Sequence, residues 1–379
     1  MSKTGRPPTG STGKKAGDNP WRRREGRHQP GSEVGRLSAV SLASKALSRG
    51  IAFLTSRQGE DGLWRDFLTP AGEASLWPTG FIGGALHEAG VEVTSSTLQR
   101  AAGALLFHQD TAGGWGYNED VPHDADSTAC ALLFLARMDC PKEAKERAIA
   151  CLLTHQRPQT GGIATFRESG PIRNYMGVGR WMGFGGWCHP HTEVTALAIR
   201  ALVASGWGGG ETELSSAWDY IRQRQRADGS WTSYWWPSPH YTVLQAATCA
   251  QLLGDEQGAL LAGNWALRTQ SSEGTWGMPA VPISAFASAL GLSMLAKARV
   301  APAPIESAAR QLVAMQDADG SWPNDPILRI PLPSVIDPEK RHIWLLGSRG
   351  IGIVVADQHR TFTSAACVAA LAGALSLLG

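Results

Sequence analysis

Two carboxylates stand two positions apart in residues 123–129, which read His-Asp-Ala-Asp-Ser-Thr-Ala. Neighbouring carboxylates resist ionising together, and a site with little water favours the neutral form further. A carboxylic acid that stays protonated at neutral pH can donate a proton. We therefore predict that the pair Asp124 and Asp126 can supply a general acid. The alternative is that Asp126 only caps the following helix, because Asp before Ser-Thr-Ala suits an N-cap.

A second group of reactive side chains lies at residues 188–193, which read Cys-His-Pro-His-Thr-Glu. Thiolate, imidazole and carboxylate are zinc ligands, so Cys188, His189, His191 and Glu193 could form a metal site. Ligands so close in sequence become tetrahedral only in a sharply bent loop, and we expect no bound metal. We expect His191 and Glu193 to be partners of Asp126, because a bonded histidine would orient or reprotonate the acid. Plain loop and cap residues are the remaining alternative.

A repeated unit must position these residues. The frame Gln-x3-Gly-x-Trp occurs five times, beginning at Gln58, Gln109, Gln225, Gln270 and Gln316. A sixth copy, at Gln156, has Ile163 in place of the tryptophan. Such self-similarity indicates one supersecondary unit stacked on itself. The interval after Gln156 is longer than the others by roughly 20 residues, and insertions in repeat proteins gather on one functional face.

Each motif lies between two helical stretches of different character. The stretch before the motif carries charge, whereas the stretch after it is apolar on most faces and should be buried. We expect these buried helices at residues 81–86, 129–135, 194–202, 243–253, 285–295 and 365–378. Six pairs close naturally into a ring, which removes exposed terminal repeats. The sequence therefore predicts an all-α protein, an (α/α)6 toroid of six helix pairs, with residues 37–379 as its single domain.

The starts of the inner helices should ring one mouth of a central cavity. Most of them open with a Thr-Ala or Ser-Ala step, or with Thr-Gly in the first. Two positions before that step stand Trp77, Asp126, Glu193, Tyr241 or Thr242, Pro282 and Phe362. Aromatic walls beside one acid suit a carbocation, because ring faces stabilise positive charge. We expect the substrate to contact nine aromatic residues of the ring, the insertion and the loops: Trp77, Phe81, Trp181, Phe184, Trp187, Trp235, Trp236, Tyr241 and Phe362.

The repeated motif resembles the QW repeat of squalene-hopene cyclases, oxidosqualene cyclases and other class II terpenoid cyclases. Its first copy also carries the leading part of that repeat, Arg49-Gly50-x3-Leu54-x3-Gln58. Residues 124–129 resemble the Asp-x-Asp-Asp-Thr-Ala signature of squalene-hopene and class II diterpene cyclases, with Ser127 in place of the last Asp. In that family the middle Asp protonates an alkene or epoxide. The resemblance implies this role for Asp126, with Asp124 as its supporting carboxylate and without a required cofactor.

Three functions are open at this point. The first is a class II cyclase acting on a linear isoprenoid or isoprenoid-derived small molecule, with Mg²⁺ involved if that substrate carries a diphosphate. The second is a metal-dependent enzyme similar to the protein prenyltransferases, whose β-subunits share the toroid. Those subunits hold zinc through an Asp-x-Cys pair, which this chain lacks. The third is a toroid that binds a lipid or isoprenoid without catalysis.

Charge is distributed unevenly along the chain. Residues 1–36 hold nine Lys or Arg and three Asp or Glu, a net charge of +6, whereas the whole chain is +2 and the remainder therefore −4. This basic tail is rich in Gly, Pro and Ser, and we expect it to be disordered. We expect a solvated tail, and the alternative is a contact with anionic lipid at a membrane surface; we expect no nucleic-acid partner. The sequence leads to no prediction of the oligomeric state.

The expected location is the cytoplasm, with peripheral membrane contact as an option. The six cysteines are scattered without a CxxC pair, which indicates reduced thiols. No apolar leader follows the basic tail, and we expect no transmembrane helix.

The segment from Asn324 to Arg360 has no helical period. We expect short strands at residues 343–346 and 351–355. The segment is placed either to form a wall over the cavity or to lie on the surface as an ordinary hairpin.

Overall fold

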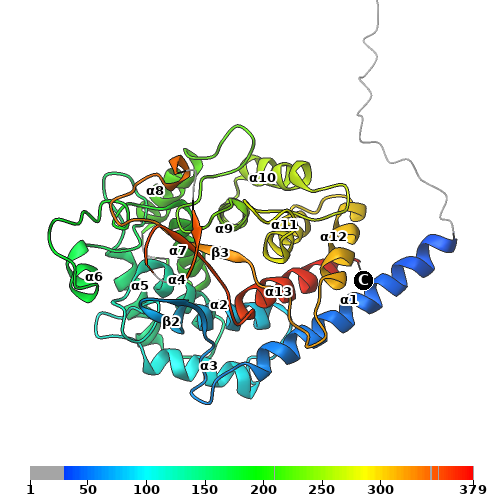
Figure 1. Ribbon diagram of the computed structural model, residues 1–379, viewed down its shortest axis with the longest axis horizontal. Helices are drawn as coiled ribbons and strands as arrows, with labels where there is room; N and C mark the ends of the chain where they lie inside the picture. The colour runs from blue at the N-terminus through cyan, green and yellow to red at the C-terminus, as the bar shows by residue number, and fades with distance from the viewer. Residues whose placement is uncertain (1–29, 209, 342–343, 349, 379) are drawn as a thin grey trace, which may run out of the picture. The chain divides into compact units, whose positions relative to one another are not determined.

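The fold is built from alternating outer and inner helices (Figure 1). The computed structural model describes residues 30–208, 210–341, 344–348 and 350–378, and residues 39–379 form one compact unit. The outer helices are α1 (Pro30–Ser56), α3 (Ser96–Phe107), α5 (Lys142–Leu153), α8 (Glu211–Arg222), α10 (Glu256–Thr269) and α12 (Pro302–Ala314). The inner helices are α2 (Leu76–Glu88), α4 (Ala125–Leu135), α7 (Thr192–Ala204), α9 (His240–Leu252), α11 (Ala285–Lys297) and α13 (Thr361–Leu378).

The inner helices form a closed circle. They contact one another in the order α2, α4, α7, α9, α11 and α13, and α13 contacts α2 again. The outer helices α3, α5, α8, α10 and α12 pack against this inner circle. The structure therefore confirms the all-α toroid of six helix pairs. It also confirms that the helix after each motif is the buried one, because most residues of each inner helix are inaccessible to solvent.

The repeated Gln and Trp fasten each loop to its neighbours. In all five full copies the indole Nε1 donates to the carbonyl ten residues earlier, as Trp64 does to Leu54 at 2.7 Å. The Gln Nε2 donates to the carbonyl of its own motif glycine and to a carbonyl of the next outer helix. In the last copy Gln316 reaches the Ala46 carbonyl in α1 at 2.8 Å. The bond that joins successive repeats thus also closes the ring.

The motif glycine makes this close approach possible. Gly320 has a φ of +91, and a Cβ on it would lie 2.6 Å from the Arg49 carbonyl oxygen. A side chain there would be strained in conformation and would push the last repeat away from the first.

The inner helices begin up to about five residues earlier than the sequence predicts. In five of them the fourth residue is Thr or Ser, whose hydroxyl accepts the backbone N–H of the motif's Trp or Ile: Thr79, Thr128, Thr195, Ser288 and Ser364. This shared bond aligns the second residues of these five helices: Trp77, Asp126, Glu193, Phe286 and Phe362. Tyr241 is the second residue of α9, whose fourth residue is Val243. The prediction of Pro282 for this layer is wrong. Ser288, not the capping Ser284, is the equivalent hydroxyl in that repeat.

Short strands occur only outside the helical ring, among the residues that the structure describes. Strands β1 (Asp66–Thr69) and β2 (Gly72–Ala74) form an antiparallel hairpin after the first motif. Strand β5 (Ile353–Ala356) pairs antiparallel with β3 (Pro326–Ile330) and parallel with β4 (Leu345–Leu346). Two strands were expected in this segment, and β4 and β5 correspond to them, although residue 343 lies outside the described residues. The third strand, β3, was not predicted.

Helix α13 differs from the expectation that no stretch is long and apolar enough to cross a membrane. Over residues 361–378 its mean hydropathy is 1.8, which passes that test by length and composition. It is nevertheless an inner helix of the ring, and 67% of it is buried there.

The basic tail is only partly visible. Residues 1–29, most of the expected disordered segment, lie outside the described residues, whereas residues 30–36 belong to α1. The six cysteines all carry free thiols.

Candidate active site

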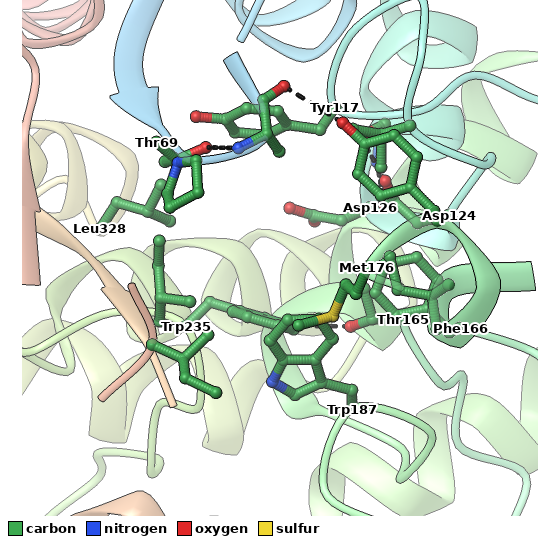
Figure 2. A pocket seen from close by; sticks show the side chains of 18 of the residues that line it. Thr69, Tyr117, Asp124, Asp126, Thr165, Phe166, Met176, Trp187, Trp235 and Leu328 are labelled. Atoms are coloured by element: carbon green, nitrogen blue, oxygen red, sulfur yellow. Dashed lines mark hydrogen bonds between the residues drawn. The ribbon is translucent and has the colours of Figure 1, made fainter. Parts of the chain in front are cut away.

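A cavity of about 600 Å³ opens where the inner helices begin (Figure 2). Its lining comes from the β1–β2 hairpin, the starts of α2 and α4, the insertion, and β3. Helix α6 (Ser169–Tyr175) belongs to that insertion. The segment 324–360 contributes Leu328, Ile330 and Ile351, so it forms a wall of the cavity, one of the two arrangements expected. The lining is mostly apolar, which makes its few carboxylates chemically prominent.

Asp126 points into this cavity from the first turn of α4 (Figure 2). Its Oδ1 is buried and has no hydrogen-bond partner among the residues that the structure describes. Burial raises the pKa of Asp126 well above its usual range, and the charges of Asp124 and Glu193 raise it further. An unsatisfied carboxylate in such a place is costly, so the neutral acid is the favoured form. The group is therefore set up to hold a proton.

Asp124 has a different task from its neighbour. It is the N-cap of α4: its Oδ1 accepts the Ser127 N–H at 2.8 Å, and its Oδ2 accepts the Ser127 hydroxyl at 2.7 Å. The cap is thus Asp124 and not Asp126, which was the alternative role for Asp126. Burial raises the pKa of Asp124 to about 6, although its bonds to Ser127 oppose that rise. Ser127 also lines the cavity, and its hydroxyl supplies a donor where the related signature has a third carboxylate.

Glu193 is buried at the start of α7, in the same layer as Asp126. Its Oε1 accepts the backbone N–H groups of Tyr234 and Trp235, at 2.7 and 2.8 Å, and its Oε2 has no partner. Burial raises its pKa, against the effect of the two backbone bonds. Glu193 therefore holds the backbone of an aromatic loop and is electrostatically coupled to Asp126.

His191 does not bond Asp126, contrary to the sequence prediction. Its Nδ1 lies 2.9 Å from the Thr165 hydroxyl and its Nε2 lies 3.0 Å from the Gly186 carbonyl. Burial lowers its pKa to about 3, so the ring is neutral. A neutral ring that donates from Nε2 to the carbonyl must accept from Thr165 at Nδ1. Thr165 in turn accepts the Trp235 indole N–H at 2.8 Å, so His191 fixes the orientation of a wall residue.

Four of the nine predicted aromatic residues line the cavity of the acid: Trp77, Trp187, Trp235 and Trp236. Phe184 lies behind Trp187, with ring centroids 5.7 Å apart, and Arg173 covers its other side. Trp181 does not line the cavity, and 80% of its surface is exposed. The insertion therefore reaches the cavity, as its position in the sequence predicts. Of its three predicted aromatic residues, however, only Trp187 lines the cavity.

The other three predicted aromatic residues lie deeper. Phe81 and Tyr241 line a second cavity, of about 360 Å³, inside the ring. Phe362 is fully buried and stacks on Phe81, with centroids 3.9 Å apart. Trp236 stacks on Tyr241 at 4.0 Å and lies 6.0 Å from Trp77. Packed aromatic rings thus separate the two cavities, and these three residues support the floor of the upper cavity rather than line it.

Several lining residues escaped the sequence analysis. Tyr117 and Thr165 each stand two positions after the last residue of a motif, Trp115 and Ile163. That fixed offset is a usable signal, because the motif places the loop at the mouth of the ring. Residues Met176, Leu328 and Ile330 belong to segments without repeat periodicity and gave no comparable signal.

The potential metal ligands of the stretch 188–193 are not among the clusters that could hold an ion in the described part of the chain. His191 and Glu193 are engaged with Thr165, Gly186 and the loop backbone. Among the described residues, a set of three potential ligands within reach of one ion occurs elsewhere, at His123, Cys151 and His155.

No protein-family model matches the chain. The chain is 25% identical over 239 residues to squalene–hopene cyclase of Zymomonas mobilis, and the aligned region covers 56% of this chain and 36% of that protein. It is 26% identical over 251 residues to drimenyl diphosphate synthase of Streptomyces showdoensis, which covers 62% of this chain and 43% of that protein. The matches therefore span less than half the length of these curated relatives.

A solved structure matches over almost the whole chain. The type II terpene cyclase MstE from Scytonema, in complex with its substrate geranylgeranyl dihydroxybenzoate, superposes with a TM-score of 0.80 and 28% identity over 90% of this chain and 99% of that chain. Its complex with the product merosterolic acid A gives a TM-score of 0.81. Together with the QW repeats, these findings show a class II terpenoid cyclase-like protein with an α/α toroid fold.

Proposed function

We propose that the protein is a class II terpenoid cyclase that protonates a linear isoprenoid, or an isoprenoid-derived substrate, from Asp126. The observation that carries the proposal is the buried Oδ1 of Asp126, which has no partner among the described residues and belongs to a mostly apolar cavity. Among the described residues, the two charged groups that act on it, Asp124 and Glu193, are both acids and raise its pKa. A carboxyl held neutral in this way can serve as a general acid at neutral pH.

The reaction is an isomerisation. The Asp126 proton moves to a terminal alkene or epoxide and leaves a positive charge on carbon. Further alkenes of the chain attack in turn, so each new ring bond uses one π bond. Loss of a proton from the final cation ends the sequence, and the composition of the substrate is unchanged. Trp77, Trp235 and Trp236 line the cavity, and their ring faces would stabilise the moving charge.

The other polar residues support the acid without matching its role. Asp124 caps the helix that carries Asp126 and adds negative charge beside it. Glu193 adds a second negative charge and holds the Tyr234–Trp235 backbone. His191 is a positioning residue, because it acts on Trp235 through Thr165. Return of the proton to Asp126 therefore needs a route other than a direct bond from His191.

The substrate class follows from the cavity and from the relatives together. The apolar walls favour a hydrocarbon chain over a polar one. The likeness to MstE favours an isoprenoid joined to an aromatic acid, and the likeness to drimenyl diphosphate synthase favours a prenyl diphosphate. The protonation step requires no cofactor, and Mg²⁺ would act only on a diphosphate group. We expect the enzyme to work in the cytoplasm, with peripheral membrane contact as an option.

The test is an assay of the purified protein with squalene, linear prenyl diphosphates with and without Mg²⁺, and geranylgeranyl dihydroxybenzoate. Mass spectrometry should show a product with the mass of its substrate and an altered retention time. Asp126→Asn assayed in parallel should form none of it. Tight binding of the same compounds by both proteins, without any product, would replace the cyclase by a lipid-binding toroid. A product in which the prenyl group is joined to an added acceptor would favour the prenyltransferase alternative.

A further inference from the structure

Three potential metal ligands converge behind the acid. His123 ends the loop before α4, Cys151 lies in the last turn of α5, and His155 follows the end of that helix. One ligand atom from each lies within 4.8 Å of the others. The two imidazole rings are 5.8 Å apart and inclined at 69°. The fold therefore brings together side chains from two successive repeats.

Hydrogen bonds leave the right nitrogens available. His123 Nδ1 lies 2.6 Å from the Asp110 carboxylate, and His155 Nδ1 lies 3.2 Å from the Ala164 carbonyl. Both partners are acceptors, so each Nδ1 carries the proton and each Nε2 presents a lone pair. The His155 Nε2 is buried and has no partner. Metal-bound histidines show this arrangement, with the second nitrogen donating to a carboxylate or a backbone carbonyl.

A glycine permits the close approach of the ligands. A Cβ on Gly114 would lie 2.8 Å from the Cys151 sulfur and 2.8 Å from the His123 Cβ. Any side chain there would stand between the thiol and the imidazole. Gly114 belongs to the second QW motif, but it is not the glycine that the motif repeats.

The cluster is accessible to an ion. His123, Cys151 and His155 line a cavity of about 270 Å³, together with Glu168 and Thr154. The His123 side chain is 29% exposed, whereas Cys151 and His155 are buried. An entry path and room for a water or carboxylate ligand are therefore present beside the three protein ligands.

We propose that His123, Cys151 and His155 bind a Zn²⁺ ion. Two imidazole nitrogens and one thiolate suit this borderline-soft ion, and a water or Glu168 would complete the tetrahedron. Zinc bonds of about 2.0–2.3 Å would draw the three ligand atoms closer together. None of the three residues lines the cavity of Asp126, so the ion does not contact the substrate. It fastens the loop that ends at His123 to the end of α5, and thereby positions the cap residue Asp124.

The first experiment measures metal in the full-length protein. After incubation with Zn²⁺ and removal of the excess, elemental analysis should find about one zinc per chain in the wild type. Cys151→Ser and His155→Gln should lose it. Cys140→Ser is the matched control. Cys140 is a free thiol that lies outside the cluster, and its sulfur donates to the Leu135 carbonyl. Absence of zinc from the wild type, or equal zinc in Cys151→Ser and Cys140→Ser, would overturn the proposal.

Two further readouts separate a metal site from damage to the fold. Co²⁺ in place of Zn²⁺ should give a thiolate-to-metal absorption band in the wild type and in Cys140→Ser, and none in Cys151→Ser. Asp110→Asn leaves all three ligands in place and keeps an amide oxygen for the Gly114 N–H, which the Asp110 Oδ1 accepts at 2.8 Å, but it replaces the carboxylate behind His123. Zinc affinity should therefore fall by about 10–100-fold. An unchanged affinity in Asp110→Asn, or a cobalt band that persists without the Cys151 thiol, would contradict this geometry. These readouts do not depend on the cyclase reaction.

Discussion

The two ends of the ring's interior hold two acids, Asp126 and Glu88, whose pKa values are shifted in opposite directions. Asp126, near the start of α4, has two charged neighbours, both of them acids, and its pKa is raised. Glu88, the last residue of α2, lines the second cavity with Arg137, Arg200 and Lys297. Burial would raise the pKa of Glu88, but the charges of Arg200, then Arg137 and Lys297, hold it below its usual range. The same kind of helix thus presents a neutral acid at one end and a charged one at the other.

The difference lies in the partners that each acid has. Glu88 Oε1 accepts from Arg137 at 2.9 Å and lies 3.9 Å from Arg200. Asp126 has no such donor for its buried oxygen. An ion pair stabilises the fold modestly and performs no proton transfer, whereas an unpartnered acid costs stability and can react. The comparison predicts that substitutions at the two sites will separate activity from stability.

The largest expected effect is on the rate. Asp126→Asn keeps the shape of the side chain but has no acidic proton, so turnover should fall by at least the roughly 10²–10⁴-fold that general acids contribute. Steady-state rates with the best substrate of the panel will measure it, and Glu88→Gln is the matched control with unchanged turnover. Retention of more than about a tenth of the rate would contradict the range expected for a general acid. Glu193 would then be the candidate, and an active Glu193→Gln as well would rule out protonation by either acid.

The second effect is the pH dependence of stability. Because the folded state raises the pKa of Asp126, it binds this proton more tightly than the unfolded chain does. The wild type should therefore lose stability relative to Asp126→Asn as pH rises from the ordinary aspartate value through the folded pKa. The loss should be about 1.4 kcal/mol for each pH unit that separates the folded pKa from the unfolded one. Denaturant unfolding between about pH 4 and about pH 8 measures this. A difference between the two proteins that stays constant over that range would show that Asp126 is not held neutral by the fold.

A smaller effect is expected at the cap. Asp124→Ala removes the acceptor of the Ser127 N–H, and loss of an N-cap typically costs about 0.5–2 kcal/mol. Asp124→Asn keeps an acceptor and should be nearly as stable as the wild type. Both variants should keep more activity than Asp126→Asn, since the proton donor remains. Thermal unfolding and turnover of the pair will check this; a complete loss of turnover in Asp124→Asn would assign the donated proton to the pair rather than to Asp126.

The smallest effect is expected for Glu88→Gln. The pair is half-exposed, at 39% for the Glu88 side chain, so its loss should cost no more than about 1 kcal/mol. The direction with pH is opposite to that at Asp126. A lowered folded pKa gives stability that is present above the ordinary glutamate value and is lost as pH falls through the folded pKa. Denaturant unfolding of Asp126→Asn and Glu88→Gln will be compared with that of the wild type over the same pH range. The comparison would be contradicted if the two differences in unfolding free energy from the wild type changed with pH in the same direction.

Periodicity predicted the ring better than it predicted the site. Five repeats of Gln, Gly and Trp sufficed for the pairing of helices, because each motif makes the same three side-chain-to-backbone bonds, two from the Gln and one from the Trp. The layer of second residues was predicted correctly except at Pro282, where two serines of one repeat compete for alignment. Only the bond from the Trp276 N–H to Ser288 distinguishes them, and a sequence does not show it.

The parts of the site that the sequence did not predict depend on contacts between distant segments. His191 has its bonds to Thr165 and Gly186 because the insertion folds back on the loop after Ile163. The cluster of His123, Cys151 and His155 joins two repeats, so spacing along the chain does not mark it. The stretch 188–193 holds more potential metal ligands close together in sequence. Its His191 and Glu193 nevertheless bond different segments of the protein. Closeness along the chain therefore did not predict which potential metal ligands lie close together in the structure; the packing of two repeats did.

Closure of the ring has a consequence for the order in which the protein can assemble. The bond from Gln316 to the Ala46 carbonyl spans 270 positions of the chain, and a Cβ on Gly50 would lie 2.8 Å from the Trp322 ring. Five of the six junctions between repeats form between neighbours in sequence, but this one waits until the last repeat exists. Until then the first helix pair presents an uncovered apolar flank, and contacts of such long range form slowly. A growing chain therefore remains an open arc of helix pairs until its final repeat is made, and the flank of the first pair stays uncovered during that time.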